Sequence, residues 1–263
     1  MAVEAKLEAK LTQESSENAS GSLKLLSVLL PVFNEAATVR PLIDRVLAAD
    51  VSLALEVVVV DDGSTDDSWQ IVSEIANGNS GVRLFRHETN RGKGAAIRTA
   101  IHYATGDVAV IQDADLEYDP AEYTRLLAPI LAGQADAVYG SRFAMAEAGN
   151  ETREHGSLAH RTANRLLTTT CNWVTGLRLT DMETCYKMVR MDVLRPLRLT
   201  ANTFTIEPQL TARLAQSGAV IQEVPISYRH RTYGEGKKIG AIDFAKALGE
   251  IFRSGIWDRR YRA

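Results

Sequence analysis

The chain alternates between short apolar runs rich in β-branched residues and polar segments with helical spacing. The apolar runs lie at residues 25–33, 55–60, 82–85, 108–111 and 137–139. Segments with apolar residues at helical intervals lie between them, at 36–49, 66–76, 94–104 and 120–131. This alternation predicts βαβ units whose parallel strands are buried on both faces of a doubly wound α/β sheet.

The pattern changes after residue 142. A polar loop at 144–156 precedes a predicted helix at 158–174, a helix near 205–216, a strand at 220–228 and a final helix at 242–252. We expect the halves 23–142 and 143–263 to share one sheet, with a glycine- and lysine-rich, mobile loop at 229–240. Residues 1–22 lack the apolar core of a signal peptide and predict a frayed helix or a disordered tail.

Composition and charge narrow the function classes. The chain has 263 residues, 45% hydrophobic, and a formal net charge of −3, so no global attraction to nucleic acid is expected. Its two cysteines indicate a reducing compartment rather than a disulfide framework. No apolar run approaches the ~20 residues needed to span a bilayer. We therefore expect a protein that is soluble or peripheral to a membrane, in a reducing compartment such as the cytoplasm.

Polar clusters follow four predicted strands, at 31–35, 61–64, 113–117 and 140–142. The carboxyl ends of parallel strands meet at one edge of a sheet, where ligands bind. Within the third cluster, Asp113, Asp115 and Glu117 alternate, so an extended backbone would turn all three to one side. Such hard oxygen ligands suit Mg²⁺ or Mn²⁺, and crowded carboxylates need a cation to ionise together. The other reading, a helix N-cap with acidic neighbours, explains Asp119 better than Asp113.

Five segments occur in a characteristic order along the chain: 31–35, 61–64 (Asp-Asp-Gly-Ser), 91–94 (Arg-Gly-Lys-Gly), 113–115 and 140–142. Together they resemble the inverting glycosyltransferases of family 2, which have the GT-A fold. Segments 180–187 and 231–238 resemble the dolichyl- or polyprenyl-phosphate sugar transferase branch, which includes dolichol-phosphate mannosyltransferases. The resemblance covers about residues 25–252. It implies transfer of a hexose from a UDP- or GDP-sugar to dolichyl or undecaprenyl phosphate, with Mg²⁺ or Mn²⁺. It makes 23–142 the nucleotide-sugar half and 143–263 the acceptor half.

The resemblance also implies a set of donor-side residues: Pro31, Glu35, Asp61, Lys93, Asp113, Arg231 and Lys237. In this reading Asp61 hydrogen-bonds the base or ribose, and Asp115 binds the metal directly. Glu117 stands where relatives often carry glutamine. Arg231 and Lys237 belong to the mobile loop, which would close over the diphosphate.

Acceptor-side roles are implied for the second half. Arg142 and Arg161 would grip the acceptor phosphate, because a planar guanidinium pairs two phosphate oxygens at once. For Arg161, a solvated helix face is an equally good interpretation. Asp181 and Glu183 would line the sugar pocket, and the implied catalytic group comprises Asp115, Arg142, Asp181 and Glu183.

Alternatives remain at this point. One is a transferase acting on a hydroxyl group of a glycan or small molecule, with Asp181 or Glu183 as base. A nucleotidyltransferase would need a glycine-rich loop where 31–35 stands, and an acidic phosphoacceptor domain would leave 231–238 unexplained. Uridine with glucose or a hexosamine is favoured over guanosine with mannose, because 183–187 departs from the mannosyl pattern. A membrane surface or membrane protein is the expected partner, and nucleic acid is not.

Overall fold

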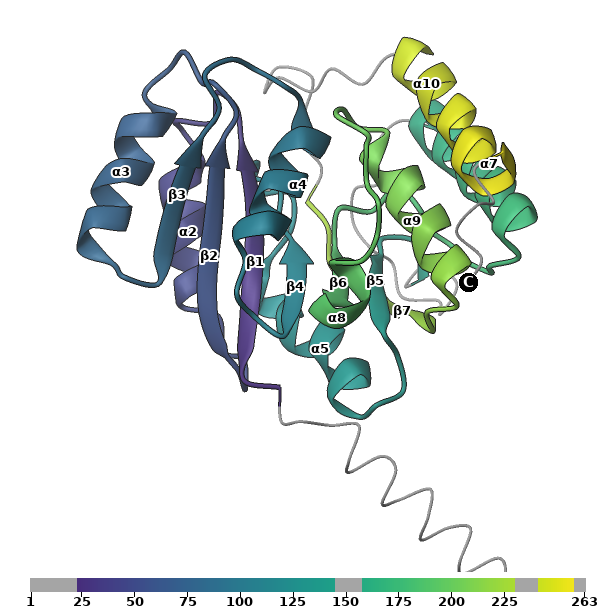
Figure 1. Cartoon of the computed structure of the whole chain (residues 1–263), viewed down its shortest axis with the longest axis horizontal. Coiled ribbons are helices and arrows are strands. Elements are labelled where there is room, and N and C mark those ends of the chain that lie inside the picture. The colour runs from purple at the N-terminus through teal and green to yellow at the C-terminus, as the bar shows by residue number, and fades with distance from the viewer. Residues whose placement is uncertain (1–22, 145–157, 230–240, 258–263) are drawn as a thin grey trace, which may run out of the picture.

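The computed structural model describes residues 23–144, 158–229 and 241–257. One seven-stranded sheet has the order β3-β2-β1-β4-β6-β5-β7 (Figure 1). Its strands are β1 (Leu25–Val32), β2 (Ala54–Asp61), β3 (Val82–Arg86), β4 (Val108–Ile111), β5 (Ala137–Ser141), β6 (Lys187–Arg190) and β7 (Ile221–Pro225). All neighbouring pairs are parallel except those of β6, which runs antiparallel to β4 and β5.

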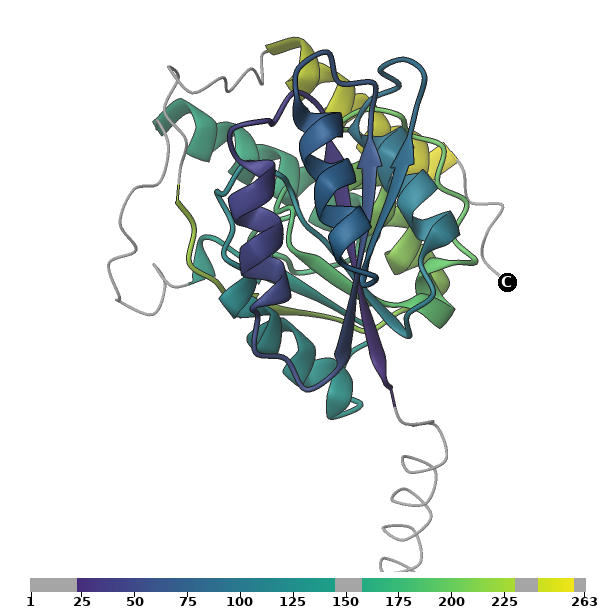
Figure 2. The ribbon, with the colours of Figure 1, turned by 90° about the vertical axis from the view of Figure 1, so that its left-hand side faces the viewer.

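Helices cover both faces of this sheet. They are α2 (Val39–Leu47), α3 (Ser68–Gly78), α4 (Lys93–Tyr103), α5 (Tyr123–Leu131), α7 (Leu158–Thr175), α8 (Met191–Leu194), α9 (Ile206–Ser217) and α10 (Ala241–Phe252). A 3-10 turn, Pro120–Glu122, precedes α5, and a π-helical turn, Arg253–Trp257, follows α10. Figure 2 shows α2 and α4 on opposite faces, and Figure 1 shows α7 and α10 outside α9.

The central strands form the core because their side chains are apolar on both faces. Val57–Val60 of β2 are fully buried, and so are Leu29 and Leu30 of β1. Val108 and Val110 of β4 are buried as well. Burying each such side chain contributes roughly 1.5–3 kcal/mol before chain entropy is subtracted. The sheet is therefore a rigid base for the loops at its edge.

The connections place a crevice at a defined point of that edge. From β1 the chain moves outward to β2 and β3, and then returns to the other side of β1 to form β4. In open α/β sheets, ligands bind outside the carboxyl ends of the strands where the order reverses. Here that point lies between β1 and β4, at the upper edge in Figure 1.

The sequence predicted this architecture, and the α/β fold is confirmed. Asp119 caps the turn before α5 as predicted, its Oδ1 accepting the amide hydrogen of Ala121 at 3.1 Å. Two boundaries differ, and one strand was missed. The helix expected from residue 36 begins at Val39, after Asn34 at φ 56°, and the last strand ends at Pro225. Strand β6 was not predicted.

None of the described helices is both long enough and apolar enough to cross a bilayer. The predicted tail at 1–22, and the loops at 144–156 and 229–240 for most of their length, lie outside the described residues.

Candidate active site

Asp61 ends β2 and is fully buried at the edge of the sheet. Its Oδ2 atom lies 3.1 Å from Nε of Arg86 and accepts the amide hydrogen of Ser64 at 3.3 Å. Its Oδ1 atom is buried and has no hydrogen-bond partner among the described residues. An unsatisfied buried carboxylate oxygen costs free energy, so this atom has the capacity to accept a hydrogen bond from a ligand.

The loops that follow β1 and β2 are joined by side-chain hydrogen bonds. The amide of Asn34 donates to Oγ of Ser64 at 3.0 Å, and the amide of Glu35 donates to Oγ of Ser68 at 2.8 Å. Pro31 lies in β1 and pairs with β2, the strand that ends at Asp61. The structure thus brings Pro31, Glu35 and Asp61 to the same edge.

Asp62 organises the next loop. Its carboxylate accepts the amide hydrogens of Arg91 at 3.0 Å and Gly92 at 2.7 Å, and contacts Nδ1 of His87 at 2.6 Å. These bonds fix the segment that leads into α4. Sequence reasoning grouped Asp62 with Asp61 but did not single it out.

The first turn of α4 packs against the backbone before α9. A Cβ on Gly94 would lie 2.5 Å from the carbonyl oxygen of Ala201, and the Ala95 amide donates to the Asn202 carbonyl at 3.1 Å. Gly92, at φ 93°, would also collide with Asn202 if it carried a Cβ. The helix predicted from residue 94 is confirmed and begins at Lys93, and its first turn faces backbone carbonyls of the protein.

Lys93 lies at the centre of a buried charge network. Its Nζ atom is 2.8 Å from Oδ1 of Asp113 and 3.0 Å from Oε1 of Glu207. Lys187, which is fully buried, pairs with the other oxygen of Glu207. Burial alone would lower the pKa of Lys93, but Asp113 and Glu207 outweigh it and raise that pKa well above its usual value. Two cations therefore balance two carboxylates.

The carboxylates of 113–117 do not converge as predicted. Strand β4 ends at Ile111, and Leu116 has φ 60°, so the backbone does not continue in the extended form assumed from the sequence. Asp113 turns to Lys93, whereas Oε2 of Glu117 accepts a 2.6 Å hydrogen bond from Tyr228. Among the described residues no group of three or more acidic, histidine or cysteine side chains could hold a metal ion. The prediction of a three-carboxylate cluster is corrected accordingly.

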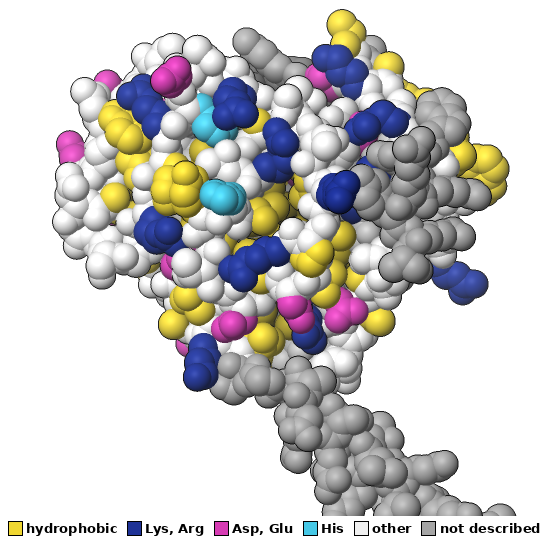
Figure 3. Space-filling model, viewed as in Figure 1, with side chains coloured by type: hydrophobic (Ala, Val, Ile, Leu, Met, Phe, Trp, Pro, Cys, Tyr) yellow, Lys and Arg dark blue, Asp and Glu magenta, His cyan; other side chains and the backbone are white. Residues whose placement is uncertain are grey.

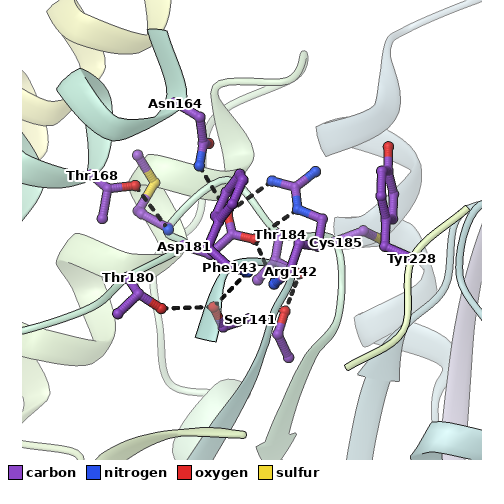
Figure 4. A network of polar contacts seen from close by, with 12 residues as sticks. Ser141, Arg142, Phe143, Asn164, Thr168, Thr180, Asp181, Thr184, Cys185 and Tyr228 are labelled. Carbon is purple, nitrogen blue, oxygen red and sulfur yellow. Dashed lines mark hydrogen bonds and ion pairs between the residues drawn. The ribbon is translucent and has the colours of Figure 1, made fainter. Parts of the chain in front are cut away.

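Beyond the end of β5, Arg142 forms a bidentate ion pair with Asp181 (Figure 4). Nε and Nη2 of Arg142 donate to the two carboxylate oxygens at 2.6 and 2.8 Å, and its amide donates at 3.1 Å. Asn164 of α7 donates to the same carboxylate at 3.1 Å. Burial alone would raise the pKa of Asp181, but Arg142 and Asn164 outweigh it and lower the pKa. The ring of Tyr228 lies 5.2 Å from the guanidinium.

Glu183 differs from its neighbour Asp181. Burial raises the pKa of Glu183 to about 7, against an opposing effect of Lys187. Its Oε1 atom is buried, and no described residue forms a hydrogen bond with it. The two acids that were predicted together therefore have opposite properties: Asp181 stays ionised, and Glu183 titrates near neutrality.

The remaining predicted residues are spread more widely. Arg161 is exposed on α7, one turn before Asn164. Arg231 and Lys237 lie outside the described residues. Asp115 lies on the turn after β4, where its Oδ1 atom accepts the amide hydrogen of Glu117 at 3.1 Å.

A family model described as Glycosyl transferase family 2 matches residues 27–198. The chain belongs to this family. Among its relatives, an undecaprenyl-phosphate 4-deoxy-4-formamido-L-arabinose transferase from Aeromonas hydrophila is 30% identical over 82% of this chain and 63% of its own length. A dodecaprenyl-phosphate galacturonate synthase from Rhizobium johnstonii is 26% identical over 81% of this chain and 61% of its own. The chain thus spans less than two thirds of both relatives.

Solved structures support the same fold. The glucosyl-3-phosphoglycerate synthase of Mycobacterium tuberculosis superposes with a TM-score of 0.68 and 22% identity, covering 91% of this chain and 82% of that one. A second structure of that synthase, with Mn²⁺, UDP and phosphoglyceric acid, gives a TM-score of 0.65 at 21% identity, covering 91% and 81% of the two chains. At this identity the likeness establishes the GT-A-like fold of this family 2 chain.

The family 2 site includes residues that sequence reasoning missed. These residues contact other members of the site from distant segments of the chain. They are Asp62, Asn164, Lys187, Glu207 and Tyr228. Two of them had a sequence signal: Asp62 stands beside Asp61 at a strand end, and Lys187 ends the segment 180–187, which resembles the polyprenyl-phosphate branch.

Proposed function

We propose that this protein transfers a hexose from a UDP- or GDP-sugar to a polyprenyl phosphate, with inversion at the anomeric carbon and with Mg²⁺ or Mn²⁺. Membership of family 2 and the names of two relatives, which act on undecaprenyl and dodecaprenyl phosphate, support the reaction class. The choice of a phosphate acceptor rests on one observation, the two side-chain hydrogen bonds that Arg142 donates to the carboxylate of Asp181.

A hydroxyl acceptor must lose a proton as it attacks, so it needs a base. Asp181 is a poor base because both of its oxygens accept hydrogen bonds and its pKa is lowered. A phosphate acceptor is already ionised at neutral pH and needs no base. The pair therefore suits phosphate attack, with Asp181 orienting the guanidinium of Arg142.

The donor would occupy the crevice between β1 and β4. Asp61 Oδ1, which is buried and has no partner among the described residues, would accept a hydrogen bond from the base or ribose. Pro31 and Glu35 would flank the nucleoside. We favour uridine as the base. A protein with a similar fold was solved with UDP and Mn²⁺, which supports this choice of donor and metal.

A divalent cation would bind at Asp115 together with diphosphate oxygens and water. The described carboxylates fit this arrangement because Asp113 is already paired with Lys93 and Glu117 with Tyr228, so the protein supplies few ligands. Mg²⁺ characteristically uses one or two carboxylates and fills its octahedron with phosphate and water. The cation would neutralise charge on the leaving diphosphate. Arg231 and Lys237 would assist it from the loop at 229–240.

Arg142 would hold the acceptor phosphate with the edge of its guanidinium that faces away from Asp181, and Arg161 would approach from α7. Their contribution is positional, because in-line attack requires the phosphate oxygen close to the anomeric carbon. A lipid acceptor would place the reaction at the cytoplasmic face of a membrane.

One observation favours a second candidate. Glu183, with a pKa of about 7, has the acidity of a general base for a hydroxyl acceptor. To separate the two, the purified chain is incubated with labelled UDP-glucose, UDP-N-acetylglucosamine or GDP-mannose, Mn²⁺ and undecaprenyl phosphate. We expect an acid-labile lipid-linked sugar, lost with a chelator and in Arg142→Ala. Labelled product only on soluble hydroxyl acceptors, lost in Glu183→Gln, would favour the second candidate.

A further inference from the structure

Helices α7 and α10 expose large apolar side chains on their outer sides. Leu166 and Trp173 of α7 are 52% and 76% exposed, and Ile242 of α10 is 71% exposed. The two helices contact each other, and both contact α9 on their inner sides. Figures 1 and 2 show them side by side at the margin of the molecule. Each of these two contacting helices therefore exposes apolar side chains on its surface at this margin of the molecule.

The charges on this surface have one sign. Within the described part of α7, α10 and the turn after it, the exposed charged side chains are all basic: Arg161, Arg165, Lys246 and Arg253. The sequence of α7 contains no acidic residue. In α10, Asp243 is half-buried, and the buried Glu250 pairs with Arg253 at 2.7 Å. The surface is basic although the whole chain carries a net charge of −3.

We call these residues the α7/α10 face: Arg161, Arg165, Leu166, Trp173, Ile242 and Lys246. Figure 3 shows hydrophobic side chains at the upper and right-hand margins, over these two helices. An exposed tryptophan and aliphatic side chains among basic residues form the pattern of proteins that lie on anionic bilayers. Apolar groups enter the headgroup region, while Lys and Arg attract the anionic surface.

We infer that the α7/α10 face docks the protein on a bilayer that carries anionic lipids. The inference rests on the proposed function, because a lipid acceptor must be reached at such a surface. Helix α7 also connects the face to the site: Asn164, one turn after Arg161, donates to Asp181, which holds Arg142 (Figure 4).

The test is flotation of the full chain with protein-free vesicles that contain no polyprenyl phosphate. We expect binding to phosphatidylcholine–phosphatidylglycerol vesicles, little binding to phosphatidylcholine alone, and weakening by salt. Trp173→Ser with Ile242→Ser should reduce partitioning roughly tenfold or more. Arg165→Glu with Lys246→Glu should reduce it by at least about fivefold per residue.

Leu131→Ser with Val220→Ser is the matched control, because both residues are similarly exposed (44% and 54%) but lie outside the face. Equal binding by control and face variants would overturn the inference. So would binding only to native membranes, which would indicate a protein partner. A dimer that dissociates on Trp173→Ser, measured by light scattering without vesicles, would identify a second copy as the occupant and would also overturn it.

A pair of activity assays separates this inference from the proposed function. With a short, water-soluble prenyl phosphate and no vesicles, Trp173→Ser with Ile242→Ser should transfer sugar at the wild-type rate. With undecaprenyl phosphate embedded in anionic vesicles, its rate should fall about tenfold, in line with the loss of partitioning. Normal flotation without transfer to either acceptor would contradict the proposed function alone. Transfer to both acceptors with unchanged flotation of the variant would contradict the docking face alone.

Discussion

Arg142 and Asp181 are joined by two side-chain hydrogen bonds of 2.6 and 2.8 Å and by a third from the Arg142 amide. The arginine follows β5 and the aspartate follows α7, so the pair connects the end of a central strand to the segment after that helix. Because Asp181 is fully buried, its charge depends on this partner. Asp181 thus connects two segments of the structure and also orients the guanidinium of Arg142.

Asp181→Asn should lower the free energy of unfolding by about 3–5 kcal/mol, since it leaves the guanidinium of Arg142 without its counter-charge. Urea denaturation at pH 7.5 measures this loss. The double variant Arg142→Met/Asp181→Leu should be less destabilised than Asp181→Asn, because no buried charge remains. A double variant that loses more than the single one would show that the pair does not act as we describe.

Asp61→Asn should weaken the binding of UDP, and it should also lower stability because Oδ2 of Asp61 lies 3.1 Å from Nε of Arg86. The amide would place a donor or a neutral oxygen where Oδ1 of Asp61 now has no partner among the described residues. Loss of one hydrogen bond to a charged acceptor costs roughly 1.5–3 kcal/mol, or about 10- to 100-fold in Kd. Isothermal titration with UDP measures it.

Asp107→Asn is the control for that experiment. Asp107 caps the opposite end of β1, accepting the amide hydrogens of Lys24 at 2.7 Å and Leu25 at 3.1 Å. We expect this variant to lose stability and to keep the Kd for UDP. Unchanged UDP binding by Asp61→Asn would remove Asp61 from the donor site.

Glu183→Gln should stabilise the protein at alkaline pH. The pKa of Glu183 is raised from 4.5 to about 7, so the folded state holds its proton more tightly than the unfolded state does. Stability from this group is therefore full below about pH 4.5 and is lost as pH rises through 7. At pH 8 the variant should gain up to about 3 kcal/mol relative to the wild type, and at pH 5 much less. Denaturant midpoints across this range test it, and a pH-independent difference would contradict it.

Lys93→Met should lower the free energy of unfolding by about 3 kcal/mol or more, because Asp113 and Glu207 lose their shared cation. The same change should tighten Mn²⁺ binding without nucleotide, since Asp113 regains an uncompensated charge near Asp115. Paramagnetic resonance of a Mn²⁺ titration measures this effect, with Lys24→Met as an exposed control. Unchanged Mn²⁺ binding by Lys93→Met would place the cation away from Asp113.

The sequence predicted the strands and helices correctly where the local hydrophobic pattern matches the burial of the side chains in the folded protein. Strands such as Val57–Val60 are apolar on both faces because helices cover both sides of the sheet. Strand β6 was missed because it has only four residues and carries Lys187 and Arg190 at its ends. Lys187 is nevertheless fully buried, since Glu207 from a distant helix neutralises it.

The site was predictable to the extent that it lies at strand ends. Asp61 ends β2, Asp113 and Arg142 follow β4 and β5, and topology brings them to one edge. Side-chain direction was not predictable, because it depends on long-range partners. Tyr228 reaches Glu117 across 111 positions of sequence, which withdraws that carboxylate from the cluster expected beside Asp115.

We propose that a cation at Asp115 and a nucleotide at Asp61 share the edge between β1 and β4. Anomalous diffraction from crystals of this protein with Mn²⁺ and UDP tests it most directly. We expect a manganese peak beside Asp115, diphosphate oxygens around it, and the base or ribose within hydrogen-bond distance of Asp61 Oδ1. Manganese and nucleotide bound in another part of the molecule, with this edge empty, would contradict the account.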